Sequence, residues 1–450
     1  MKTKLLITAL SLYCINSFAQ GIYNDGAKII IQSGAVVNII GTDGNYRNET
    51  KDASDGAITL DGVIQLTKDW TNNASGGSVL ANVGTDGKTV FAGSGTQTIG
   101  GSSINTFQFE KLEVKSGSTT QVSLGKTITV NGDFSNNGTF ILKSDADNVV
   151  SFIDNGTING SGSAKVQKSL AADRWWYISS PMSNATASAF TGLSSSFETG
   201  TRLFYWDEVT THNYVNVTAG TDALPKLRGY SVKNYPSKGA GLLPINFIGS
   251  LNTGTVGSAD NLTRTGTGSF AGYNLVGNPY PSAIDWGSEN DTTLGLTKMN
   301  LEPTIWYRSN GGFATYNWTG DGTGAGTPAG QQYVPATQAF WVRVASGNAS
   351  GTLQLTNDTR THNSQSFYKK SVETNIFRIE ASRDTLRDEA VVGFYQNAQE
   401  GFENYDSEKM FSPENDYPQI YTLTTDNTEV VINGFAELAS NEERIVPLGF

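Results

Sequence analysis

The stretch GVIQLTKDWTNNA, residues 62–74, alternates apolar and polar side chains and then ends in an Asn-rich turn. The stretch KTITVNGDFSNNG, residues 126–138, matches it at an offset of 64 residues, with Asp133 in the place of Asp69. Alternation over a short run is typical of a β-strand, and Asn and Gly provide the positive φ angles that tight corners require. We therefore predict a β-solenoid for residues 20–168, with a β-sandwich as the alternative.

A second repeat follows further along the chain. The stretches WYISSPMSNATASAF (176–190) and YNLVGNPYPSAIDW (273–286) each read as a strand that runs into a proline-containing turn. In both copies an aromatic hairpin, an aromatic strand and a closing strand come next, and Pro181 and Pro279 lie 98 residues apart. Proline fixes φ and offers no N–H to a ladder, so it is suited to ending a strand. Duplication of so hydrophobic a segment favours structural framework over a catalytic loop.

These patterns predict an all-β protein, with an N-terminal β-solenoid or β-helix-like region followed by tandem β-sandwich modules. We expect the two modules at residues 169–268 and 269–360. Residues 361–450 continue the strand pattern and predict a C-terminal β-domain. We expect this domain to be incomplete, because the sequence stops on the apolar strand IVPLGF.

Composition limits the classes of partner. The 450 residues include 31 basic and 42 acidic side chains, which gives a net charge of −11 at pH 7. Phosphate backbones and anionic lipid surfaces both require neutralisation by Lys and Arg, so this balance argues against nucleic acid and against an anionic membrane surface.

The N-terminus has the pattern of a secretory signal. Lys2 and Lys4 precede an apolar run over residues 5–15, and the small residues Ser17 and Ala19 follow it. We predict a signal peptide at residues 1–19, with cleavage after Ala19 that leaves Gln20 as the new terminus. The run is too short for a membrane span, so we expect none in the mature chain. The only cysteine lies inside the signal, so the mature protein has no disulfide.

Several stretches are similar to segments of large secreted proteins of Bacteroidota bacteria. They are YNLVGNPYPSAIDW, the DWTNN and DFSNNG turns, the run FRIEASRDTLRDEAVVGFYQNAQEGFENYDSEKMF, and VPLGF. Over most of its length the chain thus resembles adhesin-like proteins that are exported through the type IX secretion system. The resemblance implies a surface-attached or released exoprotein that uses this secretion machinery. The C-terminal sorting domain usual in such proteins is not visible in these 450 residues.

Residues suited to catalysis are sparse. His212 and His362 are the only histidines, and we expect both to be solvent-exposed loop residues. Neither has a second His or a Cys nearby, and no serine-hydrolase elbow, P-loop or HExxH motif occurs. Asp69 and Asp133 recur at matching positions, so they are read either as a wall of acids on one solenoid face or as corner residues that bond the backbone of their own turns. We favour the corner residues, and we assign no catalytic residue.

Only weaker patterns bear on metal and glycan sites. The Gly-rich loops at 41–46, 144–148 and 319–326 contain oxygen ligands that suit Ca²⁺, but none has EF-hand spacing, so we predict no cofactor and leave Ca²⁺ open. Aromatic residues recur on the module strands, where burial in a core is the favoured role. As glycan-stacking candidates we name the residues next to charged neighbours or in the aromatic hairpins: Tyr205, Trp206, Trp306 and Tyr307.

The function we expect is that of a secreted or cell-surface structural and adhesion protein without catalytic activity, which presents a rigid β-scaffold to glycans, polymers or cells. One alternative is a carbohydrate-active β-helix enzyme, a polysaccharide lyase or glycosidase, with an acidic groove along one solenoid face. Another is an accessory protein that only binds carbohydrate.

Overall fold

The computed structural model describes residues 5–6, 21–74, 76, 79–80, 86–102, 106–145, 148–235, 241–259, 261–287, 294–309, 312–318, 325–326, 332–363, 376–439 and 442–450. The predicted cleavage site at Ala19 and Gln20 lies outside this part of the chain. Strands dominate, and the described residues contain no α-helix. None of the described helices is long and apolar enough to span a membrane. The all-β prediction is confirmed.

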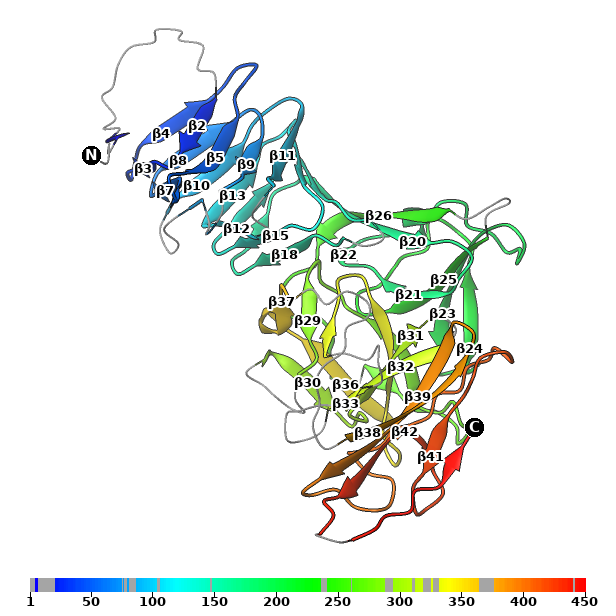
Figure 1. Ribbon diagram of the computed structural model, residues 1–450. Coiled ribbons are helices and arrows are strands. Elements are labelled where there is room, and N and C mark those ends of the chain that lie inside the picture. The colour runs from blue at the N-terminus through cyan, green and yellow to red at the C-terminus, as the bar shows by residue number, and fades with distance from the viewer. Residues whose placement is uncertain are drawn as a thin grey trace.

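The N-terminal region is a parallel β-solenoid of about six coils, each with three faces (Figure 1). Strands of the first face are β2 (Ile22–Asp25), β5 (Tyr46–Lys51), β9 (Trp70–Asn72), β11 (Thr96–Gly100), β14 (Thr119–Val122), β17 (Thr139–Leu142) and β20 (Ser163–Ala171). The second face contains β1 (Leu5–Leu6), β3 (Lys28–Ile31), β7 (Ala57–Leu60), β12 (Thr106–Phe109), β15 (Thr127–Val130) and β18 (Ser151–Asp154). The third contains β4 (Val36–Ile39), β8 (Val63–Leu66), β10 (Lys88–Phe91), β13 (Lys111–Val114), β16 (Phe134–Asn136) and β19 (Ile158–Asn159). A short strand β6 (Ser54–Asp55) pairs with β5.

The coil period is near 24 residues, since Tyr46 lies opposite Ile22 and Trp70 lies opposite Tyr46. Trp70 is on the first face and Phe134 on the third, so the 64-residue sequence repeat does not superpose coils. The unit that repeats in the sequence is a third of a coil, a strand of about four residues together with the corner that follows it. An offset of 64 residues therefore corresponds to about eight such units. Each strand buries alternate side chains, which fill the solenoid with aliphatic and aromatic groups.

An asparagine ladder runs inside the first coils. Asn24, Asn48 and Asn72 are buried and spaced 24 residues apart. The Asn48 amide donates to Asn72 Oδ1 at 3.1 Å, and the Asn24 amide donates to the Tyr46 hydroxyl at 3.1 Å. Each of the three side chains thus has at least one polar partner, so they are tolerated in the interior behind the first face.

Module 1 is continuous with the solenoid, because the last strand of the first face, β20, pairs with a strand of the module. Its outer sheet has the order β21-β25-β23-β24, formed by β21 (Trp176–Ser179), β25 (Gly229–Tyr235), β23 (Gly200–Asp207) and β24 (Asn213–Val217). Its second layer is β26 (Leu242–Leu251), which pairs antiparallel with β20 of the solenoid and with β22 (Met182–Ser183). The turn η1 (Ala187–Ala189) packs on β26. β20 runs across the predicted boundary at residue 168, and the solenoid and module 1 share one hydrophobic core.

Module 2 repeats this strand order. Its outer sheet is β28-β35-β31-β32-β33, formed by β28 (Tyr273–Gly277), β35 (Ala339–Arg343), β31 (Thr304–Ser309), β32 (Gly312–Asn317) and β33 (Ala325–Gly326). Two small sheets complete the module: β27 (Leu262–Thr263), β36 (Ser350–Leu355) and β30 (Leu296–Met299), and β34 (Tyr333–Val334), β29 (Ala283–Asp285) and β37 (Arg360–Thr361), with the turn η3 (Asn357–Thr359) before β37. Equivalent strands thus occur in equivalent places, and the predicted tandem arrangement is confirmed.

Equivalent residues of the two modules make reciprocal contacts, as if related by a local pseudo-twofold axis. The Ser179 amide donates to Thr337 O at 2.8 Å, and the equivalent Gly277 amide donates to Leu227 O at 3.0 Å. Leu227 and Thr337 also share a left-handed backbone, with φ of 65° and 66°. Duplicated segments therefore contact each other through the same residues, as copies in a symmetric dimer do.

The C-terminal residues form a sheet of order β38-β39-β42-β41-β43, built from β38 (Ile376–Arg383), β39 (Leu386–Tyr395), β42 (Glu429–Ala436), β41 (Tyr421–Leu423) and β43 (Leu448–Gly449), with β40 (Ser407–Glu408) paired to β42. It packs on module 2, where the Trp306 indole donates to Glu408 O and the Asn317 amide donates to Asp406 O. Figure 1 places this sheet at the opposite end of the molecule from the first solenoid coils.

Candidate functional site

The motif YNLVGNPYPSAIDW is a joint rather than a catalytic loop. The amide of Phe152, on the solenoid, donates to Pro281 O at 2.9 Å. Asn278 is fully buried, and its side-chain amide is within hydrogen-bond distance of the carbonyls of Ser282, Val334 and Pro335. The prediction that the motif is framework agrees with these contacts.

Beside this motif lies a fully buried ion pair between solenoid and module 2. Arg360 Nη1 is 2.5 Å from Asp154 Oδ1, and both side chains have 0% exposure. Thr253 donates a short hydrogen bond to the other Asp154 oxygen, and Arg360 Nη2 donates to Phe152 O at 2.8 Å. The guanidinium also lies over the Tyr280 ring, 5.2 Å from its centroid. The pair is thus fully surrounded by partners, which a buried charge requires.

His362 is a second contact between module 2 and the solenoid. Its two ring nitrogens lie 2.8 Å from Thr129 Oγ1 and 2.8 Å from Ser151 Oγ. Burial, reinforced by the positive charge of Arg360, lowers the pKa of His362 to about 4. The expectation of a solvent-exposed loop histidine is wrong here, because the ring closes a gap against strands β15 and β18.

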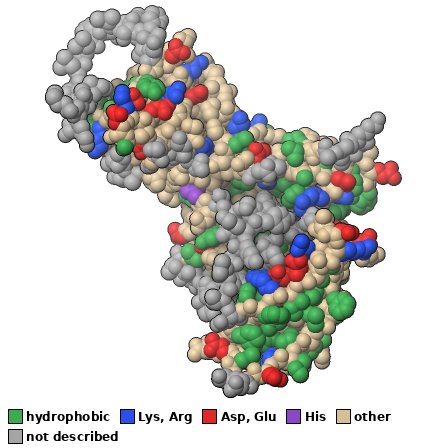
Figure 2. Space-filling view, viewed as in Figure 1, with side chains coloured by type: hydrophobic (Ala, Val, Ile, Leu, Met, Phe, Trp, Pro, Cys, Tyr) green, Lys and Arg blue, Asp and Glu red, His purple; other side chains and the backbone are tan. Residues whose placement is uncertain are grey.

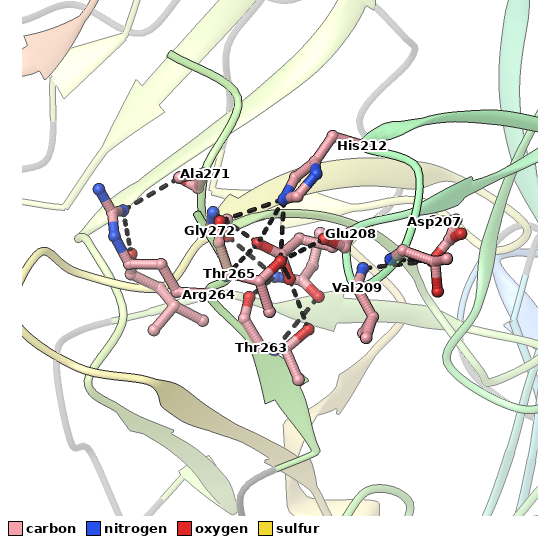
Figure 3. A network of polar contacts seen from close by, with 12 residues as sticks. Asp207, Glu208, Val209, His212, Thr263, Arg264, Thr265, Ala271 and Gly272 are labelled. Atoms are coloured by element: carbon pink, nitrogen blue, oxygen red, sulfur yellow. Dashed lines mark hydrogen bonds and ion pairs between the residues drawn. The ribbon is translucent and has the colours of Figure 1, made fainter. Parts of the chain in front are cut away.

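Figure 3 shows the described network that brings an acid, a histidine and a hydroxyl together. Glu208 follows β23 and is 3% exposed. Its Oε2 accepts from Thr263 Oγ1 at 2.8 Å, and its Oε1 accepts from the amides of Thr265 at 2.7 Å and Gly272 at 2.9 Å. These partners lie at the end of β27 and in the segment between β27 and β28.

His212 completes the network in a geometry that does not suit nucleophilic catalysis. Its Nε2 is 2.8 Å from Thr265 Oγ1 and 3.9 Å from Glu208 Oε1. A catalytic triad has the acid and the hydroxyl on opposite ring nitrogens, whereas here both face the same one. The Thr265 hydroxyl also lies 2.7 Å from Glu208 O, which ties its proton to the main chain. The network therefore fastens module 1 to module 2, and His212 is one-third exposed rather than free in solvent.

Asp69 and Asp133 are corner residues on different faces, but each bonds a residue of the following coil and not, as predicted, the backbone of its own turn. Asp69 accepts from the Thr98 amide at 2.7 Å and precedes β9, whereas Asp133 accepts from Thr157 Oγ1 at 2.5 Å and precedes β16. The hydrogen bond from Thr157 lowers the pKa of Asp133. These two acids do not form a wall along one face, so the acidic groove expected of the enzyme alternative is not built from them.

Two of the four proposed glycan-stacking residues are wrong. Trp306 is 0% exposed and Tyr307 is 6% exposed, because their rings pack inside module 2 and against the C-terminal sheet. Tyr205 is partly buried, and the Arg228 guanidinium lies 4.9 Å from its ring centroid.

Trp206, the fourth candidate, lies next to the exposed residue Phe270. Its ring is 5.3 Å from Trp341 in an edge-to-face contact and 6.1 Å from Phe270, which is 63% exposed. Trp206 is therefore part of an aromatic contact between the modules.

A pocket of about 330 Å³ opens where module 1, module 2 and the C-terminal sheet meet. In Figure 2 basic and acidic side chains gather side by side in this part of the surface. The pocket is lined by Asp173, Arg174, Trp175, Lys233, Arg308, Leu386 and Glu414. Three cations and two carboxylates thus share a cavity with one indole ring. Such a combination suits an anionic ligand that also has a ring face.

No three His, Cys, Asp or Glu side chains gather into a metal-binding group in the part of the chain that the structure describes. The loop at 41–46 is described, whereas most of 319–326 and two residues of 144–148 lie outside it.

A family described as a domain of unknown function (DUF8693) matches residues 65–450. The chain belongs to this family. The match includes both modules, the C-terminal sheet and every residue that lines the pocket. Neither the curated proteins nor the solved structures contain a match to the chain.

The sequence pattern favours a core role for the module aromatics, to which Trp175 of this DUF8693 member belongs, and nothing in it singles out Arg174, Lys233 or Arg308. The DRWW run at 173–176 could have pointed to this pocket, because it contains two charged residues next to two tryptophans. Lys233 and Arg308 lie far apart in the sequence, on β25 and β31, and only the packing of the modules brings them to one cavity.

Proposed function

We propose that this protein is a secreted or cell-surface structural and adhesion protein, which holds a rigid β-scaffold against glycans, polymers or cells without catalysis of its own. The supporting observation is that the solenoid and the modules are joined twice. One joint is the continuous pairing of β20 with β26, and the other is the buried contact of Asp154 with Arg360.

Two separated joints remove the freedom to bend about either one, so the chain is suited to transmit force and to hold a surface in a fixed orientation. His362 lies beside the second joint, whereas His212 and the buried Glu208 lie in the contact between the two modules. The signal expected at residues 1–19 supports a role outside the cytoplasm. Resemblance to type IX-exported adhesin-like proteins supports the same role.

The test is a binding and turnover experiment on the chain purified after export. Fluorescently labelled protein is applied to immobilised neutral and acidic polysaccharides and to whole cells, while release of reducing ends and of unsaturated sugars is followed. We expect retention on at least one surface without product release. Turnover that a single carboxylate substitution abolishes would instead establish the carbohydrate-active enzyme.

A further inference from the structure

We propose that the pocket between the modules and the C-terminal sheet binds one anionic pyranose residue of a carboxylated or sulfated polysaccharide. An aromatic row on the outer sheet of module 1 would support the neighbouring sugar residues. This inference rests on the proposed function, because it names the ligand class that the scaffold holds.

The charge of the pocket differs in sign from that of the chain. Its lining has three cations against two carboxylates, whereas the whole chain has a net charge of −11. A locally positive cavity in an acidic protein favours an anionic ligand and guides it to this position.

The cations are held in place while their present partners are exposed. Lys233 is 18% exposed and lies 3.1 Å from Asp173, which is 71% exposed. Arg308 is 8% exposed and lies 2.6 Å from Glu414, which is 50% exposed. Ion pairs with an exposed partner contribute little to stability, so a ligand carboxylate or sulfate replaces them at small cost. The cations therefore form a preorganised anion site.

The pocket opens onto aromatic rings. The Trp175 ring lies 5.8 Å from that of Phe204, and Phe204 is stacked with Phe197 at 6.4 Å. Phe197 is 60% exposed, and the Arg202 guanidinium lies over its ring at 4.1 Å. A free phosphate or sulfate ion needs only the cations, whereas the exposed ring of Phe197 and the half-buried rings of Phe204 and Trp175 also offer apolar contact to consecutive sugars. These contacts favour a polymer over a small ion.

The outer sheet of module 2 shows that cations on such a sheet bind carboxylates. There Arg343, on β35, pairs with Glu408 of the C-terminal region and lies over the ring of Tyr273. The outer sheets of both modules thus present Arg or Lys beside aromatic residues, and at this position of module 2 a carboxylate already pairs with the cation. A strand-sized partner does not fit a cavity of about 330 Å³, so we assign the pocket to a sugar ring.

Calorimetric titration of the exported chain tests the inference with three probes: a galacturonic acid hexasaccharide, a sulfated galactan hexasaccharide and neutral cellohexaose. We expect one or both anionic probes to bind and the neutral one not to bind, and the two anionic arms distinguish carboxylate from sulfate. Lys233→Gln should weaken binding about tenfold, because it removes one charge-assisted contact. Trp175→Ala should weaken it roughly threefold to tenfold by removing the ring.

Asp173→Asn should have the opposite effect and tighten binding, since it removes the carboxylate that competes for Lys233. A residue with a merely structural role would not produce opposite signs at two ends of one ion pair. Arg47→Gln is the matched control, because Arg47 is 53% exposed and paired to Glu49 on the solenoid, away from the pocket. If Lys233→Gln does not fold, the Asp173→Asn and Trp175→Ala variants decide.

Unchanged affinity in Asp173→Asn and Trp175→Ala would overturn the inference, and so would equal binding of the neutral hexasaccharide or the absence of binding by both anionic probes. If the native chain still binds polymers or cells in those cases, the proposed function stands and only the pocket assignment fails. If the native chain binds none of these surfaces, the proposed function fails as well.

Discussion

Glu302 shows how burial at a domain contact controls a single carboxyl group. Its side chain is 13% exposed and lies 3.7 Å from the Arg343 guanidinium, next to the C-terminal sheet. Burial raises the pKa of Glu302 to about 7, although Arg343 and Arg264 oppose this. The unfolded chain releases this proton near pH 4.5, so between pH 4.5 and 7 the unfolded state binds fewer protons and native stability falls as pH rises.

We therefore expect Glu302→Gln to gain in free energy of unfolding, relative to the native chain, as pH rises from 4.5 to 8. The gain is at most about 3.5 kcal/mol, from about 1.4 kcal/mol per pKa unit over a shift from 4.5 to about 7. Urea unfolding at both pH values measures it. Glu380→Gln is the control, since Glu380 is 41% exposed in a surface pair. A constant difference across this pH range would show that Glu302 is not held protonated.

At the scale of elements, the contact between the modules depends on small residues. A Cβ on Gly277 would lie 2.1 Å from Ser179 Cβ, so Gly277→Ala should destabilise the protein by about 1–3 kcal/mol through overpacking. Gly95→Ala is the matched control, because nothing lies within 4 Å of its Cβ position. Thermal unfolding compares the two. Ser179→Gly should recover part of the loss when combined with Gly277→Ala, and an absence of recovery would contradict this packing.

The sequence predicted elements better than their arrangement. Alternating strands and Asn/Gly corners indicated a solenoid, but the 64-residue match concealed the coil, because similar strand-and-corner units occur on all three faces. The buried residues Asn24, Asn48 and Asn72 contained the coil period, since stacked amides recur once per coil. The pocket could not be predicted in the same way, because Lys233 and Arg308 converge only after two modules and a third sheet have packed together.

At the scale of the whole molecule, the proposed scaffold function requires a stiff connection between the solenoid and the modules. The pairing of β20 with β26 fixes one side of it, over eight residue pairs. On the other side Asp154 neutralises Arg360 at 0% exposure, beside the ring of Tyr280. Without the ion pair, module 2 would hold the solenoid mainly through hydrogen bonds such as those of His362 and Phe152, so the solenoid would be less firmly fixed.

Asp154→Ala removes the acid and leaves the guanidinium buried without its counter-charge, which costs about 3–5 kcal/mol. We expect a lower thermal midpoint, together with a larger radius of gyration and a broader distance distribution in small-angle X-ray scattering, as the solenoid swings relative to the modules. Glu380→Ala is the matched control, because it breaks an exposed Arg–Glu pair that contributes at most about 1 kcal/mol. If both variants lose the same stability and scatter like the native chain, the buried pair does not stiffen the scaffold. The rigidity that the proposed function requires would then come from the sheet and core that the solenoid shares with module 1.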